Sequence, residues 1–148
     1  MIIEYNKLDK WDQRFLDLAS HVADWSKDPS TKVGSVVVAS DRRIMSLGYN
    51  GFPRGVEDTH ERLNDRETKY KYVAHAERNA LDNTDQGVRG CAMYVTLQPC
   101  PECVKSIIQR GITKVVYKYN AERENLSQFL QYSLTMLEEA GVEVIQVS

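Results

Sequence analysis

The sequence predicts an α/β fold, a three-layer α/β/α sandwich in which helices cover both faces of a five-stranded mixed sheet. Two strand-forming runs with a short connection between them are typical of an antiparallel hairpin. Two strand–helix–strand units follow, and their right-handed crossovers make the second half of the sheet parallel. The 148 residues can bury one substantial core, so we expect a single domain over residues 1–148.

The first elements along the chain are an amphipathic helix and the hairpin. Apolar residues recur every three or four positions from Trp11 to Trp25, and the pattern stops before Asp28. The strands of the hairpin are expected at residues 33–38 and 43–48. Because the apolar face of the helix needs a partner, we expect it to pack on the sheet.

Residues 49–72 form the least regular part of the sequence. They are polar, contain Gly51, Pro53 and Gly55 close together, and show no sustained period. We therefore expect a long loop with a function, because idle loops of this length are uncommon in compact domains. The later pattern predicts helices at residues 74–81, 100–109 and 126–140, and strands at residues 92–97, 114–117 and 142–147.

Composition and charge narrow the classes of function. A formal net charge of −2 and a pI of about 5.9 provide no overall positive field for a nucleic acid polymer. The charged N-terminal segment and the lack of an apolar run of about 18 residues lead us to expect a cytoplasmic protein. Three cysteines cannot all pair, and the close spacing of Cys100 and Cys103 favours metal or redox chemistry. Cys91 is expected to be a buried strand residue.

Two short motifs carry the chemistry, and each is expected to begin a helix. His75, Cys100 and Cys103 provide one imidazole and two thiolates, which leave the fourth tetrahedral position of a zinc ion open, as in catalytic sites. The helix N-terminus favours the thiolate form of both cysteines. Glu77 lies two positions after His75 and therefore points about 200° away around the helix, so it does not join the same ligand set.

This combination suits hydrolysis of an exocyclic amine. Attack at C4 of a cytosine ring needs hydroxide at neutral pH, and zinc lowers the pKa of a bound water from 15.7 to about 7. Glu77 can accept the proton of that water, deliver it to ring N3 and later protonate the departing amine. His-x-Glu together with Pro-Cys-x-x-Cys is the recognised signature of zinc-dependent deaminases.

Each motif alone has a plainer interpretation. A single C-x-x-C pair can be redox-active or half of a structural zinc site, and a single His-x-Glu is usually a solvated helix turn. A structural site would need a fourth cysteine or histidine, but Cys91, His21 and His60 stand alone. A zinc-stabilised binding module without turnover would have no use for Glu77 beside an open coordination position. The two motifs together therefore favour catalysis.

Longer stretches of the sequence resemble one family. They are SKDPSTKVGSVVV at residues 26–38, GYNGFPRG at 48–55, KYKYVAHAE at 69–77, HAERNA at 75–80 and TLQPCPEC at 96–103. On these stretches the chain resembles, over nearly its whole length, the deoxycytidylate (dCMP) deaminases of the cytidine deaminase-like superfamily. The resemblance implies zinc-dependent hydrolysis of dCMP to dUMP and ammonia, which supplies thymidylate synthesis.

The resemblance also implies substrate-binding residues. Asn50 matches the asparagine that bonds the sugar, although by itself it would be a turn residue beside a glycine. Ala76 matches a backbone position that helps to hold the pyrimidine. Lys32 and Arg54 fall in motifs near the ligand, where each is either a phosphate contact or a solvated charge.

The sequence departs from the family pattern after its fourth expected strand. Relatives commonly place an aromatic residue over the active site at the position that Glu122 occupies here, so Tyr119 is the candidate for this role. Residues 54–69 contain no cysteine and a single isolated histidine, His60, so they lack the ligand set that gives some relatives a second zinc. We therefore expect one zinc per chain.

Regulation and assembly are implied by the same resemblance. We expect dCTP to activate and dTTP to inhibit the enzyme, bound with Mg²⁺ at a site separate from the zinc, in a homo-hexamer. The candidate regulatory residues are Gly48, Tyr49, Asn50, Gly51 and Arg54, because glycines permit close approach to a triphosphate and arginine offers charge-assisted bonds. The alternative is a Gly-rich loop that only borders the substrate.

The substrate also has alternatives: free cytidine, guanine, or adenosine in tRNA. An enzyme acting on a polynucleotide would be expected to carry a basic face, which a net charge of −2 does not suggest. The expected partners are therefore small nucleotides, with neither a nucleic acid polymer nor a membrane.

Overall fold

A six-stranded mixed sheet forms the middle layer of the molecule. The computed structural model describes residues 2–148, apart from the side chains of residues 124–127. The strand order is β1-β6-β5-β4-β2-β3. The strands are β1 (Ile2–Ile3), β2 (Gly34–Val38), β3 (Ile44–Tyr49), β4 (Ala92–Val95), β5 (Lys114–Lys118) and β6 (Glu143–Val147). The helices are η1 (Tyr5–Lys7), α1 (Lys10–Ala23), α2 (His60–Asn64), α3 (Arg66–Tyr72), α4 (Ala76–Asp82), α5 (Pro101–Gln109), η2 (Ala121–Leu126) and α6 (Ser127–Glu139).

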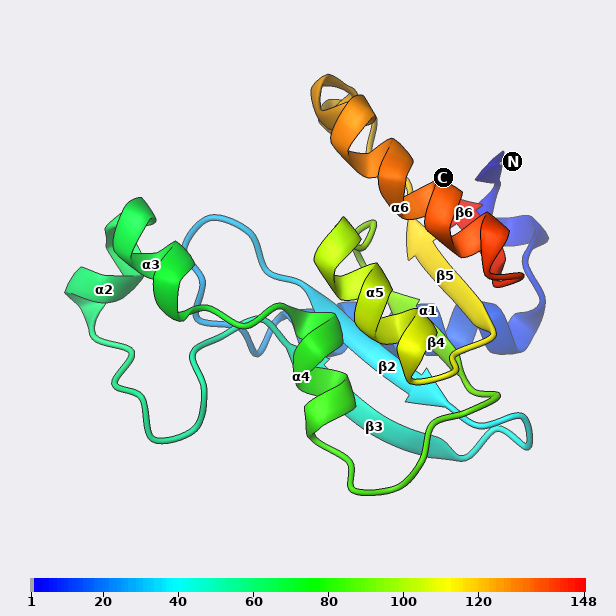
Figure 1. The fold of residues 1–148 in the computed structure, drawn as a ribbon, viewed down its shortest axis with the longest axis horizontal. Helices are drawn as coiled ribbons and strands as arrows, with labels where there is room; N and C mark the ends of the chain where they lie inside the picture. The colour runs from blue at the N-terminus through cyan, green and yellow to red at the C-terminus, as the bar shows by residue number, and fades with distance from the viewer. Residues whose placement is uncertain (1) are drawn as a thin grey trace.

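Helices cover both faces of the sheet, as the three-layer prediction requires (Figure 1). Helix α1 packs on one face, where its buried Leu16 joins a core cluster with Val36 and Val116. Helices α4, α5 and α6 pack on the other face, in a second cluster that contains Val37 and Ile107. Successive residues of β2 thus point to opposite cores, as the two-residue period of a strand dictates.

The hairpin and the parallel half of the sheet are confirmed. Strands β2 and β3 are antiparallel, with Gly34 opposite Tyr49 and a register shift between Val37 and Val38. Strands β4, β5 and β6 run parallel, as the two strand–helix–strand units predict. In the part of the chain that the structure describes, none of the helices combines the length and the apolar composition that a membrane-spanning helix needs.

The expected count of five strands was wrong by one. Strand β1 adds a sixth at the edge of the sheet, parallel to β6, with Ile2 opposite Gln146. A two-residue strand shows no alternation of polar and apolar residues. Pairing with a distant strand forms it, so the local pattern could not reveal it.

The expectation of a long loop at residues 49–72 was also wrong in part. The short helices α2 and α3 lie in this segment, to one side of the sheet (Figure 1). The Thr59 hydroxyl oxygen caps α2 by accepting a hydrogen bond from the Arg62 backbone N–H at 3.2 Å. With five and seven residues, these helices are too short to produce a visible helical period.

Close packing of helices on the hairpin depends on two glycines. A Cβ atom at Gly34 would lie 2.0 Å from the carbonyl oxygen of Ala19 in α1. A Cβ atom at Gly48 would lie 2.3 Å from the backbone nitrogen of Ala80 in α4. Both contacts are with backbone atoms, which cannot turn aside. The two glycines therefore set how closely α1 and α4 approach the sheet.

Candidate active site

Two helix N-termini bring the predicted metal ligands together. His75 is the N-cap residue of α4, and Cys100 is the N-cap residue of α5, with Pro101 as the first helical residue. Cys103 lies one turn further along α5 and is buried. The pyrrolidine ring of Pro101 suits the first helical position, where no hydrogen bond from its nitrogen is needed. The sequence therefore starts α5 so that both sulfur atoms face His75.

The three ligand atoms fit a zinc ion. All of them lie within 4.8 Å of one another. Among the described residues, this is the one group of three or more histidine, cysteine or acidic side chains close enough together to hold a metal ion. Nδ1 of His75 lies 3.3 Å from Sγ of Cys103 and 3.5 Å from Sγ of Cys100. A tetrahedral zinc with bonds of about 2.0 Å to nitrogen and 2.3 Å to sulfur would separate such ligands by about 3.5 Å. The three ligands leave a fourth coordination position open.

The charges of this group also favour a cation. The hydrogen bond with Cys103 lowers the pKa of the Cys100 thiol to about 4, and His75 contributes to the same shift. The same pairing, together with burial, raises the pKa of Cys103. One thiolate is therefore already stable, and a bound zinc ion would deprotonate the second thiol as well.

Glu77 lies beside this group without belonging to it. Its side chain is only 4% exposed, and burial raises the pKa of its carboxyl above the ordinary value. It lines the same cavity as His75 and Cys100. A carboxyl group with a raised pKa can accept a proton and return it near neutral pH, which is the task of a general acid–base.

A cavity of about 590 Å³ is lined by His75, Glu77 and Cys100. That volume lies in the range of ordinary small-ligand pockets. Ala76 and Asn50 line it, together with residues of α3 and of the segment after β5. The cavity is thus bounded by five separate parts of the chain, within residues 28–33, 50, 66–77, 97–100 and 120–123.

The side chain of Asn50 holds the neighbouring loop in place. Its Oδ1 accepts a hydrogen bond from the backbone N–H of Val33 at 2.8 Å, and its Nδ2 donates to the carbonyl oxygen of Thr31 at 2.9 Å. The carbonyl oxygen of Asn50 accepts a bond from the Ser26 hydroxyl at 2.7 Å. Asn50 therefore fixes the backbone of Thr31 and Val33, which form part of the cavity wall.

A buried ion pair in the same wall was not predicted. Nζ of Lys69 lies 3.1 Å from Oδ1 of Asp28, and both residues line the cavity. Asp28 also accepts bonds from the backbone N–H groups of Ser30 and Thr31. Burial raises the pKa of Asp28, but these bonds and the Lys69 ammonium outweigh it and hold the pKa below its ordinary value. In the sequence, both charges were indistinguishable from solvated ones.

The other substrate candidates lie elsewhere. Lys32 is exposed and is not among the described residues that line the cavity. Arg54 is exposed and donates to Oδ1 of Asn83 at 2.6 Å. The backbone N–H of Tyr119 donates to the carbonyl oxygen of Val147, and its side chain is not among the described lining residues. Glu122, which occupies the position of the family aromatic, does line the cavity.

The candidate regulatory residues form a connected segment beside the site. Gly51 exchanges two backbone hydrogen bonds with Ala74, next to His75. Tyr49 is exposed and packs edge-on against Trp25 with ring centroids 6.2 Å apart. Gly48 lies against the backbone of α4. The segment is therefore tied to the helix that presents His75 and Glu77.

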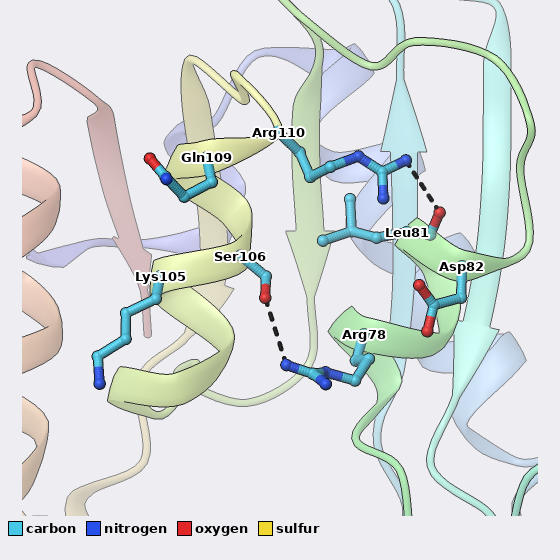
Figure 2. A pocket seen from close by; sticks show the side chains of 7 residues that line it. All are labelled: Arg78, Leu81, Asp82, Lys105, Ser106, Gln109 and Arg110. Atoms are coloured by element: carbon cyan, nitrogen blue, oxygen red, sulfur yellow. Dashed lines mark hydrogen bonds between the residues drawn. The ribbon is translucent and has the colours of Figure 1, made fainter.

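A second hollow lies between the two ligand-bearing helices (Figure 2). Two arginines cross it: Arg78 donates to the Ser106 hydroxyl at 3.4 Å, and Arg110 donates to the carbonyl oxygen of Leu81 at 3.2 Å. None of the three metal-ligand side chains lines this hollow. The two hydrogen bonds that cross the hollow link α4 to α5 and so help to fix the relative positions of the predicted metal ligands.

Zinc-dependent deaminases are the class of protein that combines an open His/Cys/Cys metal group with a glutamate outside the ligand set. Comparison with known proteins agrees with this class. The family model for the cytidine and deoxycytidylate deaminase zinc-binding region matches residues 9–119, and the chain belongs to this family.

Individual relatives are similar over most of the chain. An uncharacterized deaminase from the luxG 3′ region of Aliivibrio fischeri is 44% identical over 140 residues, which cover 93% of each chain. Deoxycytidylate deaminase of Mus musculus is 41% identical over 134 residues, which cover 84% of this chain and 75% of the mouse protein. The crystal structure of dCMP deaminase from cyanophage S-TIM5 in complex with dCMP and dUMP aligns with a TM-score of 0.73 at 26% identity, covering 94% of this chain and 98% of that one.

Proposed function

We propose that this protein hydrolyses dCMP to dUMP and ammonia and so supplies dUMP for thymidylate synthesis. The observation that carries the proposal is Glu77, a buried carboxyl with a raised pKa beside a zinc-type ligand group in a cavity large enough for a nucleotide. The relatives named deoxycytidylate deaminase and the structure with dCMP and dUMP support this choice of substrate.

The residues of the chain divide the chemical work. His75, Cys100 and Cys103 would hold the zinc ion, which when bound supplies the Lewis acidity that lowers the pKa of water from 15.7 to about 7. Glu77 accepts a proton from the attacking water as its oxygen adds to C4 of the ring and passes that proton to N3. It then takes the remaining proton from the oxygen on C4 and delivers it to the amine, so that ammonia leaves as the C4–N bond breaks and the C4=O bond of uracil forms. Asn50 and the backbone of Ala76 line the cavity where the sugar and base would lie.

A substrate panel tests the proposal. Purified zinc-loaded protein is incubated with dCMP, deoxycytidine, cytidine, dCTP and guanine, and ultraviolet absorbance follows deamination of each. We expect kcat/KM to be highest for dCMP, because a charge-assisted phosphate contact contributes about 1.5–3 kcal/mol, which is roughly 10- to 100-fold. Comparable values for dCMP and deoxycytidine would indicate a nucleoside deaminase, and turnover of guanine alone would replace the proposal.

We also propose regulation of a cytoplasmic homo-hexamer of this single domain, with dCTP as activator, dTTP as inhibitor and Mg²⁺ bound with either. The support for regulation is the position of the segment that contains Gly48, Tyr49, Asn50, Gly51 and Arg54. Asn50 lines the cavity, and Gly51 is bonded to Ala74 beside His75. A triphosphate bound to this segment could therefore shift the active site, provided that it binds two states of the protein with different affinities.

Initial rates over a range of dCMP concentrations test the regulation. With Mg²⁺ present, we expect dCTP to lower the dCMP concentration needed for half-maximal rate and dTTP to raise it. Light scattering on the same samples measures the assembly. Rates unaffected by saturating dCTP and dTTP, or effects explained wholly by competition for the zinc site, would remove the regulatory proposal and leave the deaminase assignment unchanged.

A further inference from the structure

Three cationic side chains line the active-site cavity, and they differ in what they can offer a ligand. They are Arg66, Lys69 and Arg123. Lys69 is 4% exposed and lies 3.1 Å from Asp28, so its charge is already paired inside the wall. None of the ion pairs formed by side chains that the structure describes includes Arg66 or Arg123. The two arginines are therefore the cations available to an anionic ligand.

Arg66 is held in position by its own helix. It is the first residue of α3, and its Nε donates a hydrogen bond to the hydroxyl of Tyr70, one turn later, at 3.0 Å. The guanidinium carbon lies 5.5 Å from the centroid of the same tyrosine ring. These contacts use one N–H and leave the two terminal NH₂ groups, the fork that matches phosphate oxygens. Tyr70 lines the cavity as well, so the fixed guanidinium borders the ligand space.

Arg123 approaches the cavity from another part of the chain, the segment after β5. Its Nη1 donates to the carbonyl oxygen of Gln98 at 3.2 Å, and Gln98 itself lines the cavity. Glu122 lies in the same lining and opposes an anion. The Glu122 carboxylate offsets one arginine, and the second arginine remains in excess of it. Glu77, the other carboxyl in the lining without an ion-pair partner among the described residues, lies in the first turn of α4 beside His75.

We propose that Arg66 and Arg123 bind the 5′-phosphate of the substrate and thereby select a nucleoside monophosphate over the nucleoside. The inference rests on the proposed function, because it names the residues that read the phosphate of that substrate. The two arginines replace Lys32 and Arg54 as the candidate phosphate-binding residues. Lys32 is not among the described residues that line the cavity, and Arg54 is hydrogen-bonded to Asn83. The base is bound at the N-termini of α4 and α5, and the phosphate at α3 and the segment after β5.

The test compares Arg66→Gln, Arg123→Gln and the double variant with the parent protein. Lys71→Gln is the matched control, because it removes a cation from an exposed position of α3 that does not line the cavity. For each protein, kcat/KM is measured with dCMP and with deoxycytidine, after zinc content and thermal unfolding have confirmed the folded state. Each arginine variant is expected to lose about 10- to 100-fold with dCMP, mainly through KM, and little with deoxycytidine.

Calorimetric binding of the products gives a second readout that needs no turnover. The arginine variants are expected to bind dUMP about 10- to 100-fold more weakly than the parent does and deoxyuridine equally well, while Lys71→Gln matches the parent with both. Unchanged selectivity for dUMP over deoxyuridine in both arginine variants would overturn this inference alone. A zinc-loaded parent protein that fails to deaminate dCMP would instead overturn the proposed function.

Discussion

Replacing Glu77 by Gln is expected to lower kcat for dCMP by about 10²- to 10⁴-fold, the usual loss when a general acid–base is removed. The amide keeps the shape of the side chain in its buried position but cannot carry a proton. Because Glu77 is not one of the three ligands, the zinc content should stay at that of the parent. The measurements are steady-state deamination of dCMP and elemental analysis of the same preparation.

Glu102→Gln provides the matched control for this prediction. Glu102 lies between the two ligand cysteines, yet it is exposed and bonded to Lys105 at 2.7 Å. Loss of its charge should leave kcat close to the parental value, because the carboxylate is not among the described residues that line the cavity. Parental turnover by Glu77→Gln, or an equal loss in both variants, would remove Glu77 from its assigned role.

Replacing Lys69 by Met is expected to lower the free energy of unfolding by about 3–5 kcal/mol, because it leaves the buried Asp28 carboxylate without its cation. Lys71→Met is the control on the same helix. Its side chain is exposed, so the change should stay within about 0.5 kcal/mol. Urea unfolding of the zinc-loaded proteins at neutral pH measures both values. An equal effect of the two substitutions would show that the ion pair contributes nothing special.

The same pair predicts how stability varies with pH. The pKa of Asp28 is lower in the folded protein than its ordinary value of 3.8. Its contribution to stability is therefore present above about pH 3.8 and is lost as the pH falls through the folded value. In Lys69→Met the unpaired carboxylate gains from protonation. The difference in unfolding free energy between parent and variant should therefore narrow as the pH is lowered toward 3.8.

The sequence was most informative where local patterns were strong. Strand-forming runs located the hairpin and the parallel strands, although strands such as β2 are buried on both faces. Three-to-four-residue periods located helices α1, α5 and α6, because each helix buries one face. The spacing of His75, Cys100 and Cys103 predicted their convergence, since each motif opens a helix. Chemistry concentrated in two short motifs can be recognised before any fold is known.

The parts that the sequence did not reveal depend on distant contacts. Lys69 and Asp28 are 41 positions apart, and nothing in either local pattern shows that their charges meet inside a wall. Arg66 and Arg123 lie in segments without apolar period, and only the folded chain places both at one cavity. Lys32 was the opposite case, a charge in a suggestive motif that the fold leaves at the surface. Sequence motifs identify the reacting groups, whereas the residues that line the cavity are distant in sequence and are brought together only by the fold.

The products formed from dCMP test whether this protein is a zinc-dependent dCMP deaminase. Protein stripped of metal by a chelator is reloaded with increasing amounts of zinc, and chromatography and an ammonia assay follow the products. We expect dUMP and ammonia to appear in equal amounts and the rate to rise until one zinc is bound per chain. A folded protein that holds one zinc yet forms no dUMP, or that forms it equally well without metal, would contradict zinc-dependent hydrolysis of dCMP.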